Sequence, residues 1–307
     1  MSFWENFILQ LKELEKSGMS IFCIGNSVLG RPIFCIKVGE GQRKILVQYA
    51  IHAREHITYH LAILHAKKLL RDKLDASIFL IPLSNPDGVC LAVDGIESIN
   101  NINHDLEISV GHFPFCPETS TLNQLRVNKY KNTLLHINNN SDFSLWKANI
   151  NAVDLNVNFD AKWGTGKQNV FVQNSANFVG KRANSEPETQ VLVNFTKVIK
   201  PNMTISYHSK GEVIYYRFGQ TGKILKRDKK IALAISKETG YKLGRAVGSV
   251  GGYKDWCIQE LDIPSLTIEV GSDKLSHPLT TNCLPKIWEQ NRNVITKSLA
   301  LLEEFNI

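Results

Sequence analysis

Apolar residues along this chain recur with two spacings, one typical of helices and one typical of buried strands. The helical spacing covers residues 3–16, 57–71 and 226–238, and a similar pattern over 283–304 predicts a closing helix. Short continuous apolar runs, typical of strands buried on both faces, occupy residues 32–38, 44–50, 77–83, 203–207, 213–217 and 266–270. Strands that alternate with helices in this way predict an α/β fold with a mostly parallel sheet between helices.

Local signals mark where several of these elements begin or end. Asn85-Pro86-Asp87-Gly88 is a strong turn signal after the strand at 77–83. Ser185-Glu186-Pro187-Glu188 has the pattern of a capping box, so we expect Ser185 to cap a helix that reaches about residue 198. Gly251-Gly252 precedes an amphipathic segment that ends near residue 260. Residues 97–145 are rich in asparagine and irregular, which predicts a long surface excursion with local helix.

The composition is that of an ordinary globular protein. The chain has 307 residues, of which 43% are hydrophobic and 21% charged, and this is enough for a substantial core. We expect a single domain over residues 1–307, because no internal repeat or interdomain linker is visible. The formal charge of +7 indicates a mildly basic surface and no nucleic-acid partner, since no arginine-rich run or basic–aromatic interleaving occurs.

Neither the cysteines nor the start of the chain suggests a secreted or membrane protein. The six cysteines form no Cys-x-x-Cys pair, and they lie at positions 23, 35, 90, 116, 257 and 283. The first residues lack the basic start and apolar core of a signal peptide, and no apolar stretch is long enough to span a bilayer. We therefore expect free thiols, no membrane partner and a cytoplasmic location, with release from the cell by another route left open.

Two histidines and a glutamate follow two of the predicted strands. His52 and Glu55 come directly after the apolar run at 44–50, and His208 follows the run at 203–207. A catalytic zinc takes three protein ligands from imidazole and carboxylate groups and leaves a fourth position for water. In open α/β sheets, sites gather outside the carboxyl ends of strands. We therefore predict one zinc ion bound by His52, Glu55 and His208, although His-x-x-Glu alone is a common chance pattern.

Seven segments, in order along the chain, resemble the zinc metallocarboxypeptidase family, of which carboxypeptidase A is the best-known member. They are His52-x-x-Glu55, Asn85–Gly88, Trp146–Asn149, Val153–Phe159, Ser185–Glu188, His208 and Thr267–Glu269. The resemblance runs from about residue 20 to the C-terminus and implies a mixed eight-stranded sheet between helices. Two segments, Trp146–Asn149 and Gly251–Trp256, are most similar to the bacterial branch that cuts γ-D-glutamyl bonds to diaminopimelate in cell-wall peptides.

The resemblance implies roles for further residues. Glu269 matches the family's general base, which would deprotonate a zinc-bound water that attacks an amide carbonyl and then return the proton to the leaving amine. Asp154 matches the carboxylate that orients the first ligand histidine, His52. Lys147 stands where the family has an arginine that stabilises the oxyanion, and Arg54 is a second cation close to the metal.

Departures from the family pattern bear on the substrate. Asn156 is followed by Val157 where carboxypeptidases have an arginine that binds the terminal carboxylate, and valine cannot bind one. Val247 stands at the position of the tyrosine that closes over the substrate, and Tyr253 is a candidate to replace it. Lys254 falls where the side-chain pocket is specified and would suit the side-chain carboxylate of diaminopimelate, although an ordinary lysine on a helix face fits the sequence equally well.

Three hypotheses about function follow. The first is a zinc peptidase that acts on peptidoglycan peptides, with Asn156, Tyr253 and Lys254 in contact with the substrate. The second is a metallocarboxypeptidase or zinc deacylase that acts on small acyl-amino acids in a closed pocket. The third is an inactive metal-binding or peptide-binding scaffold, which Val157 and Val247 favour and the complete set of ligands and base opposes.

Overall fold

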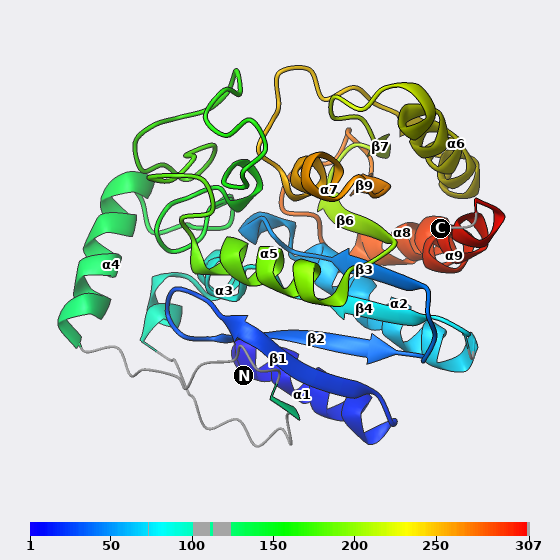
Figure 1. The fold of residues 1–307 in the computed structure, drawn as a ribbon. Helices are drawn as coiled ribbons and strands as arrows, with labels where there is room; N and C mark the ends of the chain where they lie inside the picture. Colours follow the sequence, from blue (N-terminus) through cyan, green and yellow to red (C-terminus); the bar gives the residue numbers. More distant parts are fainter. Residues whose placement is uncertain (73, 101–110, 113–123, 306–307) are drawn as a thin grey trace.

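The computed structural model describes residues 1–72, 74–100, 111–112 and 124–305, and these form a single mixed sheet with helices on both faces (Figure 1). The strands are β1 Ser20–Asn26, β2 Pro32–Val38, β3 Lys44–Gln48, β4 Ser77–Ile81, β5 Gly111–His112, β6 Met203–Ser209, β7 Val213–Tyr215, β8 Lys242–Leu243 and β9 Ser265–Val270. Within the described residues they make nine strands in the order β5-β1-β2-β4-β3-β6-β9-β7-β8. The central strands β4, β3, β6 and β9 are parallel, while β2 and β7 run antiparallel to their neighbours β4 and β9. The expected mixed, mostly parallel α/β sheet is confirmed, although the described residues form nine strands where the family resemblance implies eight.

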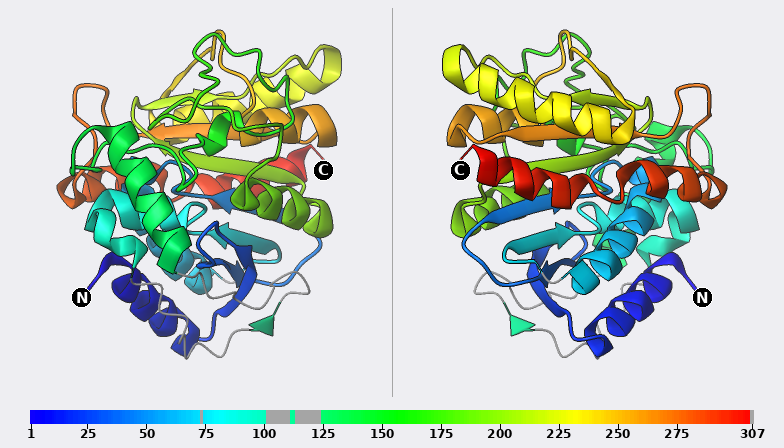
Figure 2. Two further views of the ribbon diagram at one scale, coloured as in Figure 1. Left: turned by 90° about the vertical axis from the view of Figure 1, so that its left-hand side faces the viewer. Right: turned by 90° about the vertical axis from the view of Figure 1, so that its right-hand side faces the viewer.

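Helices cover the two faces of the sheet as separate groups. They are α1 Phe3–Lys16, α2 Ile57–Asp72, α3 Pro86–Asp94, α4 Gln124–Asn138, α5 Pro187–Ile199, α6 Gly222–Thr239, α7 Tyr253–Leu261, α8 Leu284–Asn291 and α9 Val294–Glu304. The right-hand view of Figure 2 shows α1, α2, α6 and α9 along one face. Helices α5 and α7 pack on the other face, against β1 and against β6 and β9.

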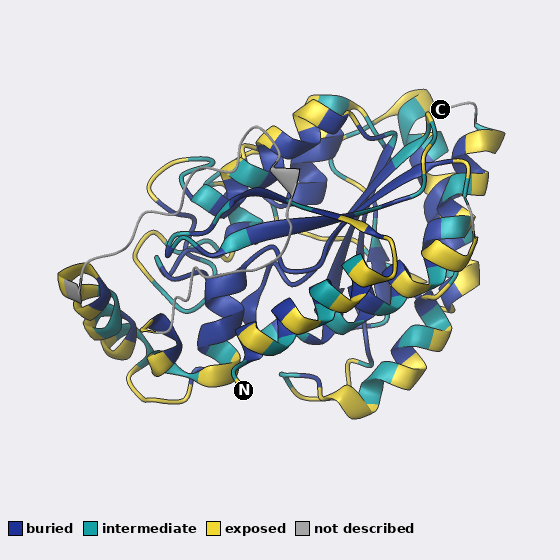
Figure 3. Cartoon of the chain, turned by 90° about the horizontal axis from the view of Figure 1, so that it is seen from below, coloured by how far each residue is buried: buried dark blue, intermediate teal, exposed yellow. Residues whose placement is uncertain are grey.

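Alternation of side chains along each strand divides the core into two layers. On β3, Ile45 and Val47 join the cluster under α1 and α2, while Leu46 between them joins the cluster under α5 and α7. This is the period of two expected of a strand, and apolar residues on both faces explain its continuous apolar run. Figure 3 shows the strands as buried and the outer faces of the helices as exposed.

Two expected element ends differ from the structure. The turn expected at Asn85 is the start of α3, because the Asn85 side chain accepts a hydrogen bond of 3.0 Å from the Gly88 amide and caps that helix. The capping box expected at Ser185 is absent, since Glu186 is the cap residue of α5 and the Ser185 hydroxyl donates to the Glu186 carboxylate at 2.6 Å. The hydrogen bond from Ser185 to the buried Glu186 carboxylate therefore takes the place of the helix cap that the sequence predicts.

Other expectations hold in part. The closing helix at 283–304 is two helices, α8 and α9, and β1 was not predicted because its glycine and asparagine interrupt the apolar run. Local helix within the irregular excursion is confirmed by α4, whereas residues 101–110 and 113–123 of that excursion lie outside the described residues.

The cysteines divide into two states. Cys35, Cys90, Cys257 and Cys283 are free, as expected, whereas Cys23 is disulfide-bonded, so the expectation of free thiols is wrong at Cys23. Cys116 lies outside the described residues. Among the described helices, none has both the length and the apolar character that a bilayer span requires.

Candidate active site

The predicted metal ligands converge where two neighbouring parallel strands end. A short 3-10 helix, Ala53–Glu55, follows β3 and turns Glu55 back toward His52. His208 lies near the end of β6, which pairs with β3 in the register Gln48 to Ser206. All three side chains are buried, with 5%, 4% and 1% exposure for His52, Glu55 and His208. The topology therefore brings together residues that lie far apart in the sequence.

The geometry of the three side chains fits a single metal ion. His52 Nδ1 lies 2.8 Å from Glu55 Oε1, and His208 Nδ1 lies 3.0 Å from Glu55 Oε2 and 3.2 Å from His52 Nδ1. Ligand atoms that share a tetrahedral zinc lie about 3.4 Å apart, because each bond is about 2.0 to 2.2 Å long. Two ring nitrogens that face each other across a buried space are stabilised by a cation between them. The trio could therefore hold one metal ion.

Charge complementarity holds this buried cluster together. Burial alone would lower the pKa of His52, but Glu55 and Asp154 outweigh it, so the pKa is raised. Burial alone would raise the pKa of Glu55, yet the adjacent His52 and His208 hold it well below its usual range. Glu55 is therefore ionised, as a metal ligand must be.

Asp154 supports His52 from the side away from Glu55. Its Oδ1 lies 3.2 Å from His52 Nε2, and its other oxygen lies 2.7 Å from Lys147 Nζ. The backbone amides of Asn156 and Asn177 each donate to it at 3.1 Å. Burial would raise the pKa of Asp154, but Lys147 and His52 reverse this and hold it well below the usual range. The carboxylate can therefore fix the orientation of His52, as the sequence predicts.

Glu269 faces the metal-binding trio from the adjacent strand. It lies on β9 directly opposite His208 on β6, so both side chains point to the same face of the sheet. Its side chain is partly exposed, yet burial still raises its pKa to about 7, against the opposing effect of His208 and of the cations Lys147 and Arg54. A carboxyl group with this pKa can gain and release a proton near neutral pH.

The two predicted cations differ in their partners. Lys147 forms an ion pair with Asp154. Arg54 is half-buried, and it acts electrostatically on both Glu269 and His277. His277, in the loop after β9, was missed by the sequence analysis, because a single loop histidine carries no spacing signal. Its pKa is lowered by burial, and Glu55 opposes that effect while Arg54 adds to it.

The structure corrects the predicted substrate contact of Tyr253. Its side chain is fully buried, and its hydroxyl lies 2.7 Å from the Thr196 hydroxyl within the core. The ring packs between Phe159 and Trp256. Tyr253 therefore cannot close over a substrate, and that prediction is wrong. Asn156 uses its side-chain oxygen to accept a hydrogen bond of 3.1 Å from the Tyr253 amide, so part of its hydrogen-bonding capacity holds the start of α7.

Lys254 is also placed differently from the expectation. Its side chain is buried, with 5% exposure, and its ammonium forms an ion pair with Asp255 and donates to the Arg217 carbonyl at 3.1 Å. The charge is therefore compensated inside the protein, contrary to the predicted role in binding a substrate carboxylate. Val247, by contrast, is 79% exposed on the segment before α7.

Comparison with protein families decides how this site is classified. A family described as zinc carboxypeptidase matches residues 4–294, which is nearly the whole chain. The chain belongs to the zinc carboxypeptidase family. This membership agrees with the buried site of His52, Glu55 and His208, which could hold one metal ion.

Individual relatives of this zinc carboxypeptidase family member come from bacteria and animals. The chain is 29% identical over 295 residues to gamma-D-glutamyl-L-diamino acid endopeptidase 1 of Lysinibacillus sphaericus, covering 91% of this chain and 66% of the relative. It is 32% identical over 142 residues to murein peptide amidase A of Escherichia coli (strain K12), covering 42% of this chain and 54% of that protein. The chain thus spans less than two thirds of the length of these relatives.

A solved structure confirms the fold. Carboxypeptidase A from Helicoverpa armigera superimposes with a TM-score of 0.69 at 18% sequence identity, over 99% of this chain and 73% of the other. At this level of identity the similarity concerns the arrangement of helices and strands, and it agrees with the mixed sheet described above.

Proposed function

We propose that this protein hydrolyses an amide bond in peptidoglycan-derived peptides, and that the bond joins γ-D-glutamate to diaminopimelate. The observation that carries the catalytic part is the convergence of His52, Glu55 and His208 within 4.8 Å, beside Glu269 on the adjacent strand. The relative from Lysinibacillus sphaericus, whose name specifies a γ-D-glutamyl-diamino acid bond, supports the choice of substrate.

The residues divide the work of catalysis between them. His52, Glu55 and His208 would hold the zinc ion, with His52 kept in orientation by Asp154. When bound, zinc supplies Lewis-acid chemistry that polarises an amide carbonyl and lowers the pKa of water. The ion pair with Lys147 keeps the Asp154 carboxylate charged and in place.

Proton transfer falls to Glu269. A carboxylate with a pKa of about 7 can accept the proton of an attacking water and donate it to the leaving amine, whose departure requires protonation. Among the described residues, Arg54 forms no ion pair with a carboxylate, whereas Lys147 pairs with Asp154. The Arg54 guanidinium would therefore stabilise the negative charge that develops on the carbonyl oxygen. Lys147 therefore serves mainly to position Asp154 and His52.

The residue at the family's carboxylate-binding position bears on which bond is cleaved. A carboxypeptidase needs a cation for the terminal carboxylate, and the family position for that cation is Val157 here. Valine offers neither charge nor hydrogen bonds. The absence of this cation favours cleavage within a branched or extended peptide over removal of its last residue.

One digestion experiment tests the proposal. We expect the zinc-loaded protein to convert L-Ala-γ-D-Glu-meso-diaminopimelate-D-Ala into L-Ala-D-Glu and diaminopimelyl-D-Ala, identified by mass spectrometry. The Glu269→Gln variant serves as the matched control and should give neither product. Release of the terminal D-Ala alone would instead indicate a carboxypeptidase, and cleavage restricted to small acyl-amino acids would indicate a deacylase. Either result would overturn the proposed specificity.

A further inference from the structure

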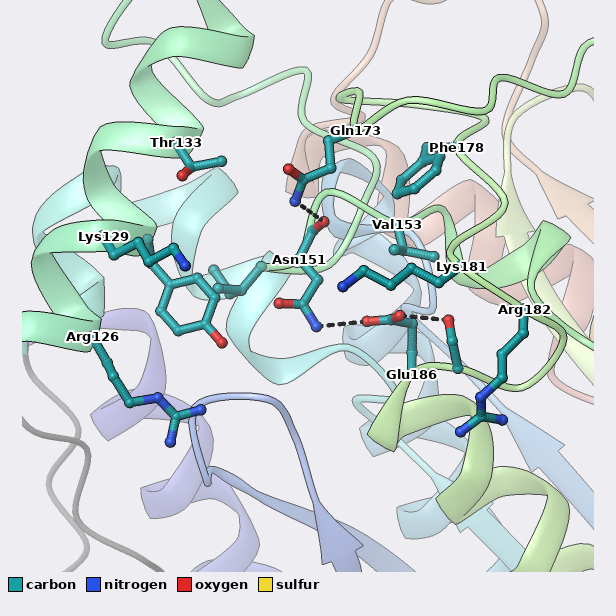
Figure 4. A pocket seen from close by; sticks show the side chains of 13 residues that line it. Arg126, Lys129, Thr133, Asn151, Val153, Gln173, Phe178, Lys181, Arg182 and Glu186 are labelled. Atoms are coloured by element: carbon teal, nitrogen blue, oxygen red, sulfur yellow. Dashed lines mark hydrogen bonds between the residues drawn. The ribbon is translucent and has the colours of Figure 1, made fainter.

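A cavity of about 690 Å³ lies between α4 and the segments at 150–153, 173–178 and 181–186. The catalytic mechanism does not use it. Figure 4 shows its walls, with Lys129 on α4 and Lys181 on the opposite side extending toward the middle. Cavities that bind small molecules have volumes of roughly 300 to 1,000 Å³, so this one can hold a ligand larger than a single ion.

The cavity and the metal-binding trio lie on different sides of one segment. Val153 lines the cavity, and its neighbour Asp154 contacts His52. Asp154 has extended backbone geometry, in which successive side chains point to opposite sides. Phe178, which also lines the cavity, accepts a hydrogen bond of 2.9 Å from the Asp154 amide. The cavity is therefore separate from the catalytic residues but is built on the same support.

Positive charge dominates the cavity walls. The cationic side chains among its described lining residues are Arg126, Lys129, Lys181 and Arg182. The single carboxylate in that lining, Glu186, is buried and already accepts hydrogen bonds from the Asn151 amide at 2.8 Å and the Ser185 hydroxyl at 2.6 Å.

The lysines are free to meet a ligand. Within the part of the chain that the structure describes, Lys129 and Lys181 form no ion pair, and both are exposed. Lys129, Lys181 and Arg182, beside a carboxylate that already accepts hydrogen bonds, therefore present positive charge to the cavity.

The rest of the lining is suited to a ring. Ile150, Val153 and Phe178 are buried apolar residues that leave a face on the cavity, and the half-buried Tyr130 adds an aromatic ring from α4. Apolar and aromatic walls with a few charged groups are typical of sites for organic ligands rather than for simple ions.

We propose that this cavity binds a phosphate ester that carries a ring, which is either a nucleotide or a sugar phosphate. A phosphate group brings a charge of roughly −1.5 to −2 and three acceptor oxygens, so one or two such groups would balance the cations. Arginine guanidinium groups match phosphate oxygens in pairs, while lysine ammonium groups add point charges. The apolar wall would contact the ring. This site is independent of the proposed peptidase specificity.

Calorimetric titration of the zinc-loaded full chain tests the proposal with three probes: ADP, glucose 1-phosphate and inorganic phosphate. We expect saturable binding of one ring-bearing probe per chain, weakened about tenfold or more in the double variant Lys129→Gln/Lys181→Gln. The matched control is Lys16→Gln/Lys67→Gln, which removes the same charge from exposed positions on α1 and α2 and should leave the affinity unchanged. All variants keep the metal site, so the difference between them reports on the cavity.

The choice between ADP and glucose 1-phosphate identifies the source of the ligand, and tighter binding of either supports the proposal. Equal weakening in the lysine variant and the control would overturn it, because the binding would then be general surface attraction. Inorganic phosphate that binds as tightly as both ring-bearing probes would refute the role of the apolar wall. No saturable binding by any of the three probes would also overturn the proposal.

Discussion

Replacing Asp154 by asparagine tests how the protein holds its first metal ligand. The carboxylate is fully buried and receives hydrogen bonds from two backbone amides and an ion pair from Lys147 at 2.7 Å. Asparagine keeps the shape but has one oxygen, so its amide nitrogen must face either the Asn177 amide and Lys147 or the Asn156 amide and His52. Either arrangement places the amide nitrogen against other donors, and both leave His52 without an anionic partner.

The expected loss follows from these contacts. Removing a carboxylate that orients a ligand histidine typically weakens metal binding by about 10- to 100-fold, or about 1.4 to 2.7 kcal/mol. The ammonium of Lys147 is mostly buried and loses its partner, so the free energy of unfolding should fall by about 3 kcal/mol as well. We therefore expect both weaker zinc binding and a lower midpoint of denaturant unfolding.

The assay is zinc competition with a chelator of known affinity, combined with urea unfolding monitored by fluorescence. Asp160→Asn is the matched control, because it makes the same chemical change at an exposed position of the same loop and should alter neither quantity. A zinc dissociation constant within about twofold of wild type for Asp154→Asn would refute the reasoning, since the carboxylate would then contribute nothing to the orientation of His52.

Three further predictions concern Glu269 and Tyr253. Glu269→Gln should lower kcat by about 10²- to 10⁴-fold while the zinc content stays unchanged, and loss of zinc in this variant would contradict its role as a base. Because a base acts in its ionised form, kcat/KM should fall as the pH drops through the pKa of Glu269. Burial raises this pKa to about 7, and a bound cation lowers it. A midpoint above about pH 8 for the loss of kcat/KM on acidification would therefore argue against this group. Tyr253→Phe should leave kcat/KM within about twofold and lower the free energy of unfolding by about 1 kcal/mol, because its hydroxyl bonds Thr196 in the core; a large drop in kcat/KM with normal stability would restore the substrate role.

The sequence predicts elements best where the hydrophobic period is unbroken. The helix at 3–16 and the strand at 32–38 match α1 and β2 at both ends. Element ends set by buried polar contacts were not predictable, because Ser185 has the local pattern of a cap yet bonds Glu186 instead. Local spacing carries no information about which partner a polar side chain meets in the folded chain.

The residues of the candidate site also differ in how far the sequence could predict them. His52, Glu55 and His208 could be proposed from the sequence, because each follows the end of a predicted strand and parallel strands bring such ends together. The side-chain orientation of Tyr253 could not, since a residue at the first turn of a helix can face either the cleft or the core. Its ring faces the core because Phe159 and Trp256 surround it there.

Anomalous X-ray scattering at the zinc edge, from crystals of the active enzyme, tests the central claim most directly. The account predicts one strong peak per chain, within bonding distance of the imidazoles of His52 and His208 and the carboxylate of Glu55. A peak bound by other residues, or a fully active enzyme without a peak between these three side chains, would contradict it.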